Sequence, residues 1–164
     1  MTRSVRDMAG VLDAVAGLMP GDPYAAPSPS RPYREEVTHQ PGRLRVGLML
    51  QTPADRTPLH GECKTAVEQT GRLLESLGHS VEAAHPAAYD EPEWLAHFGR
   101  VVQAHSSFTA HDLGTAIGRP LEPGDVEPYT WALIEEGRKI SAEHYLASAN
   151  WLQIWTRRMA SWWT

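Results

Sequence analysis

The sequence predicts an α/β fold built on a strand–helix–strand unit over residues 44–84, and two patterns support this prediction. Residues 44–50 place apolar side chains at every second position, which is typical of a buried strand. The short segment Ser-Val-Glu-Ala-Ala at 80–84 predicts a second strand. Because a helix separates the two strands along the chain, they should be parallel, with Val46 and Leu48 buried between covering layers.

The helix between the two strands is predicted by an apolar stripe and by the glycine that follows it. The stripe repeats at helical spacing and consists of Ala66, Val67, Thr70, Leu73, Leu74 and Leu77. Gly78 stands where a glycine adopts the left-handed conformation that closes a helix. Residues 52–61, before the helix, are rich in turn formers and predict a loop.

Residues 1–19 predict an amphipathic helix rather than a targeting segment. Its apolar face consists of Val5, Met8, Leu12, Val15 and Met19, at steps of three and four residues. Asp7 and Asp13 interrupt the apolar stretch, which argues against a signal peptide or a membrane span. Ser4 favours a helix start, and Pro20 favours its end.

Residues 20–43 predict an extended connection, because proline, glycine, serine and tyrosine dominate this segment. One helical turn is expected near 34–37. A disordered linker is the alternative, and the apolar side chains of Tyr24, Tyr33 and Val37 favour the ordered interpretation because they can anchor the segment.

Residues 92–164 predict a helical second half of the chain. The expected helices run from Pro92 to about His111, from Tyr129 to Gly137, and from Ser141 to the Trp162–Trp163 pair, with a loop at 118–124. Ser141 is a favourable N-cap residue, and Glu143 stands in the first turn that follows it.

Composition narrows the class of protein. The 164 residues are 41% apolar and 21% charged with a net charge of −5, as expected for one globular domain. The acidic balance argues against nucleic acid or an anionic membrane as the main partner. The single cysteine, Cys63, excludes an internal disulfide and a cysteine-based zinc site. It favours a reducing compartment, and we expect the cytoplasm.

Several residues invite a chemical role, and each has a simpler interpretation. Among eight histidines, His97 and His105 could share one helix face, but no HExxH motif accompanies them, so we expect no metal site. Ser141 beside Glu143 and His144 suggests a nucleophile with a base, yet a helix N-cap explains the same residues.

The remaining candidates are no stronger. The Ser106–Ser107 pair has no partner nearby in sequence. Arg157–Arg158 is expected to form a solvated face or to interact favourably with the dipole of its helix, and not to bind nucleic acid. Cys63 near a helix start is expected to be a buried or half-buried structural thiol. The chain contains no GxGxxG, P-loop or GxSxG motif, so the residues alone identify no active site, and no cofactor is expected.

Several stretches nevertheless resemble the amidase signature family. They are MTRSVRD at 1–7, LDAVAG at 12–17, GDPY at 21–24, the strand at 44–50, LLESLGH at 73–79 with the strand at Val81, and the helix from Ile140 through Tyr145. The similarity follows the chain from end to end in one order. Within the family, the chain is most similar to bacterial amidases of the 6-aminohexanoate-cyclic-dimer hydrolase kind.

This resemblance implies a mixed sheet covered by helices and hydrolysis of a carboxamide by a Ser–cis-Ser–Lys triad. In the family this triad lies N-terminal to the matching region, and the Gly-Gly-Ser signature is absent here. The two lysines, Lys64 and Lys139, lie outside the family's lysine motif. We therefore predict that residues 1–164 are a partial amidase domain without a catalytic residue of its own. Segments 93–113 and 126–150 are expected to line the substrate funnel of the parent enzyme. The resemblance identifies no individual residue in them that contacts the substrate.

The resemblance also sets the expected partners and the alternatives. The full-length parent would act on a small-molecule amide and could form a homodimer. A fragment similar to the amidase-type subunit of the glutaminyl-tRNA amidotransferase, and a non-catalytic α/β binding module, are the alternatives. If the rest of the domain is missing, apolar side chains at both ends should be partly bare: Met8, Leu12, Val15, Trp155, Trp162 and Trp163.

Overall fold

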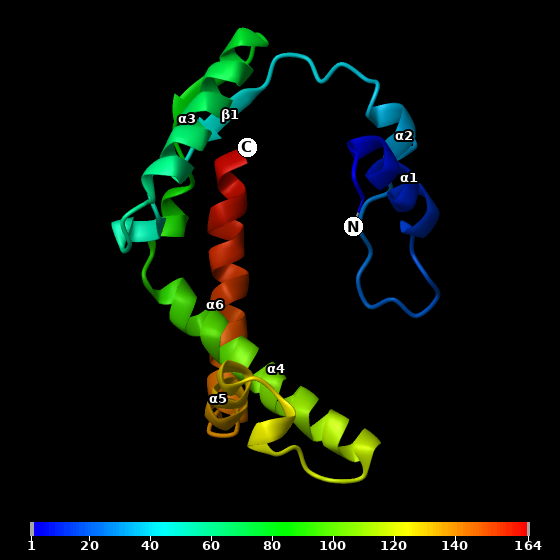
Figure 1. Ribbon diagram of the computed structural model, residues 1–164, viewed down its shortest axis with the longest axis vertical. Helices are drawn as coiled ribbons and strands as arrows, with labels where there is room; N and C mark the ends of the chain where they lie inside the picture. Colours follow the sequence, from blue (N-terminus) through cyan, green and yellow to red (C-terminus); the bar gives the residue numbers. More distant parts are fainter. Residues whose placement is uncertain (1, 164) are drawn as a thin grey trace. The chain divides into compact units, whose positions relative to one another are not determined.

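The structure, a computed structural model, describes residues 2–163 apart from the side chain of Asp55. The chain divides into two units, Met1–Leu44 and Arg45–Thr164. The first unit contains helices α1 (Val5–Val15) and α2 (Tyr33–Glu36), both labelled in Figure 1. The predicted turn near 34–37 is therefore confirmed.

Helix α1 begins as predicted and ends earlier. The Ser4 side chain accepts the Asp7 N–H at 3.1 Å, so it is the N-cap. The helix stops at Val15 rather than at Pro20, because Ala16 is already extended and Gly17 has a φ of 141°. The predicted extent 1–19 was too long, since the apolar spacing continues past the point where the backbone leaves the helix.

The carboxylate of Asp13 on α1 binds the start of α2. Asp13 accepts the backbone N–H groups of Tyr33 at 2.6 Å and of Arg34 at 3.1 Å, so it satisfies two donors at the start of α2. The Arg34 side chain covers α1 at Gly10, where an added Cβ would lie 2.7 Å from its Nη2. These contacts anchor α2 on α1 within the first unit.

The second unit contains the predicted strand–helix–strand arrangement. Strand β1 (Arg45–Leu48), helix α3 (Gly61–Ser76) and strand β2 (Ser80–Ala83) follow one another, and β1 pairs with β2 in parallel, Val46 opposite Val81. Gly78 ends the helical segment with a φ of 91°, as predicted. The α/β class and the parallel pairing are confirmed.

The two faces of this sheet are only partly covered. Helix α3 packs on it at Gly71, where an added Cβ would lie 2.5 Å from Leu48 Cδ1. Trp162 packs at Gly47, 2.9 Å from the position of a Cβ there. Val46 and Leu48 are half-buried, so the prediction of full burial was wrong. The described part of the sheet has two strands, and neither has a neighbour on its outer edge.

The helical part is organised around α4 (Glu93–Ile117), which packs against both α5 (Pro128–Gly137) and α6 (Ala142–Ala160). In Figure 1, α6 runs from its crossing with α4 toward the β1 strand. Helix α4 continues six residues beyond the expected end at His111 and stops at Gly118, whose φ is 77°. The N-cap prediction for α6 is confirmed, because Ser141 Oγ accepts the His144 N–H at 3.1 Å.

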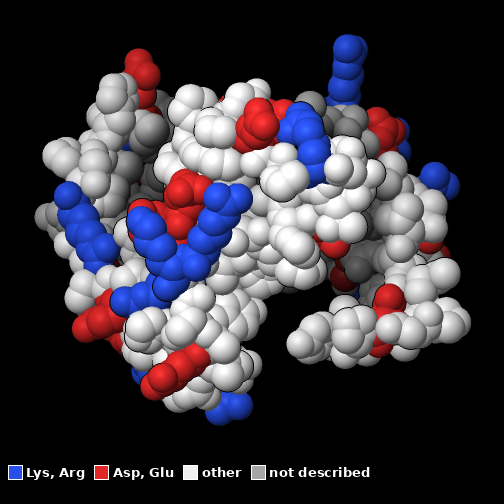
Figure 2. All heavy atoms as spheres, turned by 90° about the horizontal axis from the view of Figure 1, so that it is seen from below, with Lys and Arg blue, Asp and Glu red and all other residues white. Residues whose placement is uncertain are grey.

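Large apolar side chains remain exposed in both units. Those expected to be bare include Met8, Val15 and Trp163, which are 43%, 71% and 67% exposed, whereas Leu12 and Trp155 are half-buried. On the face drawn in Figure 2, basic and acidic side chains lie beside one another in small groups. Large areas without charged side chains separate these groups. Within residues 2–163, no helix combines the length and the hydropathy that crossing a membrane requires.

Candidate functional site

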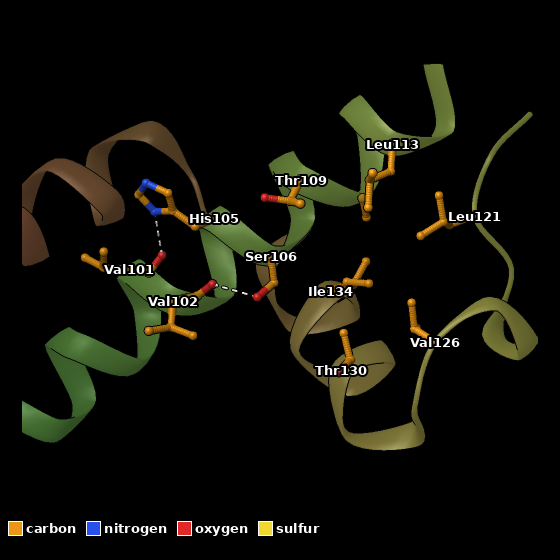
Figure 3. A pocket seen from close by; sticks show the side chains of 11 residues that line it. Val101, Val102, His105, Ser106, Thr109, Leu113, Leu121, Val126, Thr130 and Ile134 are labelled. Carbon is orange, nitrogen blue, oxygen red and sulfur yellow. Dashed lines mark hydrogen bonds between the residues drawn. The ribbon is translucent and has the colours of Figure 1, made fainter. Parts of the chain in front are cut away.

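A pocket of about 500 Å³ opens between α4, the loop after it and α5 (Figure 3). Its floor is the small core of the second unit, in which Ala110, Leu121 and Ile134 are buried and Val126 packs beside them. The volume lies in the range of roughly 300–1,000 Å³ that is usual for small-molecule sites. We take this pocket as the candidate site. Its lining consists of Val101, Val102, His105, Ser106, Thr109, Ala110, Leu113, Leu121, Val126, Thr130 and Ile134.

The loop side of the pocket is fixed by an ion pair. The Arg119 guanidinium donates two hydrogen bonds to Asp125, at 2.7 and 2.8 Å, and Asp125 also accepts the Glu122 N–H at 2.8 Å. The guanidinium of Arg119, followed by the Glu122 N–H, holds the pKa of Asp125 well below its usual range. This loop places Leu121 and Val126 against α4 and α5, so it closes one wall of the pocket.

Two polar side chains of the pocket are already occupied by their own helix. The His105 Nδ1–H donates to the Val101 carbonyl at 3.0 Å, which leaves Nε2 as an acceptor. The Ser106 hydroxyl donates to the Val102 carbonyl at 2.9 Å. Both contacts are drawn in Figure 3. No described hydrogen bond joins Ser106 to His105 or to another base, so the geometry does not activate this serine.

A second polar feature joins α4 to α6. Ser148, which is 1% exposed, lies 3.2 Å from His97 Nδ1, and the Trp151 ring stacks on the imidazole at 4.5 Å between centroids. Arg100, an obligate donor, reaches the same nitrogen at 3.5 Å. Nδ1 is therefore an acceptor, and the Ser148 hydroxyl donates to it. Burial first, and then the charge of Arg100, lower the pKa of His97, whereas Glu93 opposes them.

We expect this lowered pKa to make stability fall in mild acid. The unfolded chain takes up a proton on His97 near pH 6.5, and the folded chain takes it up only at lower pH. The contribution of His97 to the free energy of unfolding is therefore complete above about pH 6.5, and it is lost as the pH falls below that value. Urea unfolding at pH 7 and pH 5 should show a larger loss for the wild type than for His97→Gln. An equal loss of unfolding free energy in the wild type and in His97→Gln would contradict a lowered pKa of His97.

The aromatic rings around His97 form one stacked cluster. Trp94 lies between Tyr89 and Trp155, with centroid distances of 5.8 and 5.7 Å. The Trp155 Nε1–H donates to the Ala88 carbonyl at 2.7 Å, which ties α6 to the turn before α4. These contacts account for the half-burial of Trp155, and they stabilise the helices that position the pocket.

The other predicted candidates do not come together. Ser141 serves as an N-cap, with His144 bound only through its backbone. Cys63 is an exposed free thiol, so the expected buried or half-buried thiol was wrong, because α3 packs on the sheet two turns further along, at Gly71. Among the side chains that the structure describes, no three His, Cys, Asp or Glu residues are placed to hold a metal ion.

Two arrangements were not foreseen from the sequence. Arg158 was expected to be solvated, yet it donates to Glu91 at 2.8 Å and its guanidinium lies 5.4 Å from the Trp151 centroid. Asp90 accepts the Ala54 N–H at 2.7 Å and lies 2.8 Å from His85 Nε2, and these two contacts lower its pKa. No local signal predicts pairs of this kind, since their partners come from different elements.

The comparisons with known proteins extend over nearly the whole chain. The amidase family model matches residues 1–161. The chain is 33% identical over 161 residues to the 6-aminohexanoate-cyclic-dimer hydrolases of Paenarthrobacter ureafaciens and Pseudomonas sp. (strain NK87), covering 98% of this chain and 33% of each relative. A solved structure of 6-aminohexanoate cyclic dimer hydrolase superposes with a TM-score of 0.91 at 33% identity, over 99% of this chain and 34% of that one. The chain thus spans about a third of the length of the relatives it matches.

Proposed function

This chain belongs to the amidase family, and on that basis we propose that it forms the non-catalytic third of an amidase that hydrolyses the C–N bond of a small carboxamide. The observation that supports this most strongly is the match over 98% of the chain to hydrolases of about three times its length. We further propose that the enzyme works in the cytoplasm without a cofactor.

The environment of both lysines supports a catalytic centre outside this chain. A lysine acts as a neutral base only where burial lowers its pKa. Lys64 is exposed, and Lys139 is exposed and donates to Glu136 at 2.6 Å. Neither lysine has the burial that such a base requires.

The reaction that the family resemblance implies leaves a defined part to this chain. The second serine relays the proton of the attacking serine to the neutral lysine while the serine Oγ bonds to the amide carbon. The C–N bond then breaks and the same proton returns through the second serine to the departing amine, after which water hydrolyses the acyl-serine ester and releases the acid. The residues in this chain would hold the amide and exclude water from it. The pocket between α4 and α5 is the described site best suited to this part, because it is apolar and concave.

An assay of hydrolysis by the isolated chain tests the proposal that the catalytic triad lies outside this chain. The purified 164-residue chain should hydrolyse neither hexanamide nor a chromogenic anilide above background, because it lacks nucleophile and base. Turnover that survives the combined change of Ser106, Ser107 and Ser141 to alanine would contradict the proposal. The gene gives a second test, since an in-frame region encoding the lysine motif and the Gly-Gly-Ser signature is expected upstream of the Met1 codon.

A further inference from the structure

The pocket between α4 and α5 has no acidic side chain, lysine or arginine among the eleven residues of its lining. Arg119 and Asp125, on the adjoining loop, neutralise each other through two hydrogen bonds. A ligand with a full charge would therefore lose its hydration in this pocket without gaining an ionic partner.

The pocket does offer hydrogen-bonding groups, and these are neutral. Three other helical threonines, Thr70, Thr115 and Thr156, donate to the carbonyl one turn back in their helix. Thr109 and Thr130 line the pocket, and neither hydroxyl has a hydrogen bond to any described residue. A threonine hydroxyl both donates and accepts, so each can pair with a neutral polar group of a ligand.

These hydroxyls lie among aliphatic side chains. Figure 3 shows Ile134 between Thr109 on α4 and Thr130 on α5, with Leu113 and Leu121 to one side of them. His105 lies in the same lining and keeps Nε2 as a further acceptor. The combination suits a molecule with an aliphatic part and one uncharged group that both donates and accepts hydrogen bonds.

We propose that this pocket binds the uncharged aliphatic portion of an amide substrate, with the carboxamide held by the hydroxyls of Thr109 and Thr130. The proposal rests on the proposed function and adds the substrate class. Neutral aliphatic amides are accepted, and zwitterionic or ionic amides such as free glutamine are rejected. The amidotransferase-like alternative, which would require glutamine, is thereby disfavoured.

Three six-carbon probes test the charge selection on the full chain. Hexanamide, hexanoate and hexylamine each contain six carbons in an unbranched chain, and at pH 7 they are neutral, anionic and cationic. Titration followed by two-dimensional ¹H–¹⁵N NMR should show hexanamide shifting the amide signals of Thr130 and Ile134. Hexanoate and hexylamine should bind at least about tenfold more weakly at these signals. Equal binding of a charged probe, or no shift with hexanamide up to its solubility limit, would overturn the proposal.

Two variants locate the binding within the pocket. Thr130→Val keeps the side-chain shape and removes one hydroxyl, so hexanamide should bind roughly three- to tenfold more weakly. Leu113→Trp fills the pocket from a half-exposed position and should abolish binding. The matched control is Leu146→Trp, on α6 outside the pocket, where the leucine is 64% exposed against 49% for Leu113. Unchanged binding in Leu113→Trp would place the ligand elsewhere and overturn the proposal.

The result of the hexanamide-binding test can be distinguished from the result of a hydrolysis test of the proposed function. Binding of hexanamide to the chain requires no hydrolysis, so it is scored even if an assembled enzyme proves inactive on amides. Conversely, amide hydrolysis by an assembled enzyme with no hexanamide binding at Thr130 would remove this inference and leave the proposed function standing.

Discussion

Replacing Gly137 with alanine is expected to lower the free energy of unfolding by about 2–4 kcal/mol. A Cβ at this position would overlap the Gln103 carbonyl oxygen and lie 2.6 Å from the carbonyl carbon. Both atoms belong to the backbone of α4 and cannot rotate away as a side chain would. The methyl group must therefore separate α5 from α4, which opens the core around Ile134.

Gly99→Ala is the matched control for this substitution. Gly99 also lies within a helix, and no atom comes within 4 Å of an added Cβ there. Alanine has the higher helix propensity, so this variant should be as stable as the wild type or up to about 1 kcal/mol more stable. Urea unfolding of the three proteins gives the comparison. Equal stability of the two variants would show that α4 and α5 do not approach each other so closely.

Features fixed by neighbouring residues could be predicted from the sequence. The strand–helix–strand unit, the Gly78 stop and the Ser141 N-cap each depend on the chain within a few positions of the residue concerned. The parallel pairing of β1 and β2 also followed, because a helix connects them along the chain.

Features that depend on distant packing could not be predicted. The half-burial of Val46 depends on how many strands and helices flank the sheet, which alternation alone does not reveal. Helix α4 continues past His111 to Ile117, and at Gly114 it packs against the backbone of the loop that contains Leu121. The pocket brings α4 together with residues up to 33 positions further along, from Val101 to Ile134. Thr130 has no sequence feature that marks it.

The central claim is that this chain supplies the substrate-holding third of an amidase whose catalytic triad lies elsewhere. The most direct test of this claim is to place this chain in a related hydrolase, in exchange for the stretch that it matches. In the Paenarthrobacter ureafaciens hydrolase, the matching 161-residue stretch is replaced by this chain. Circular dichroism and thermal melting establish that the hybrid is folded, and a host lacking the stretch is the control.

Hydrolysis of hexanamide by this hybrid is the decisive measurement. The account predicts amide turnover that falls by at least about a thousandfold when the host's triad lysine is changed to alanine, and no turnover by the host lacking the stretch. A folded hybrid that hydrolyses no amide, or one whose turnover survives loss of the triad lysine, would contradict the claim.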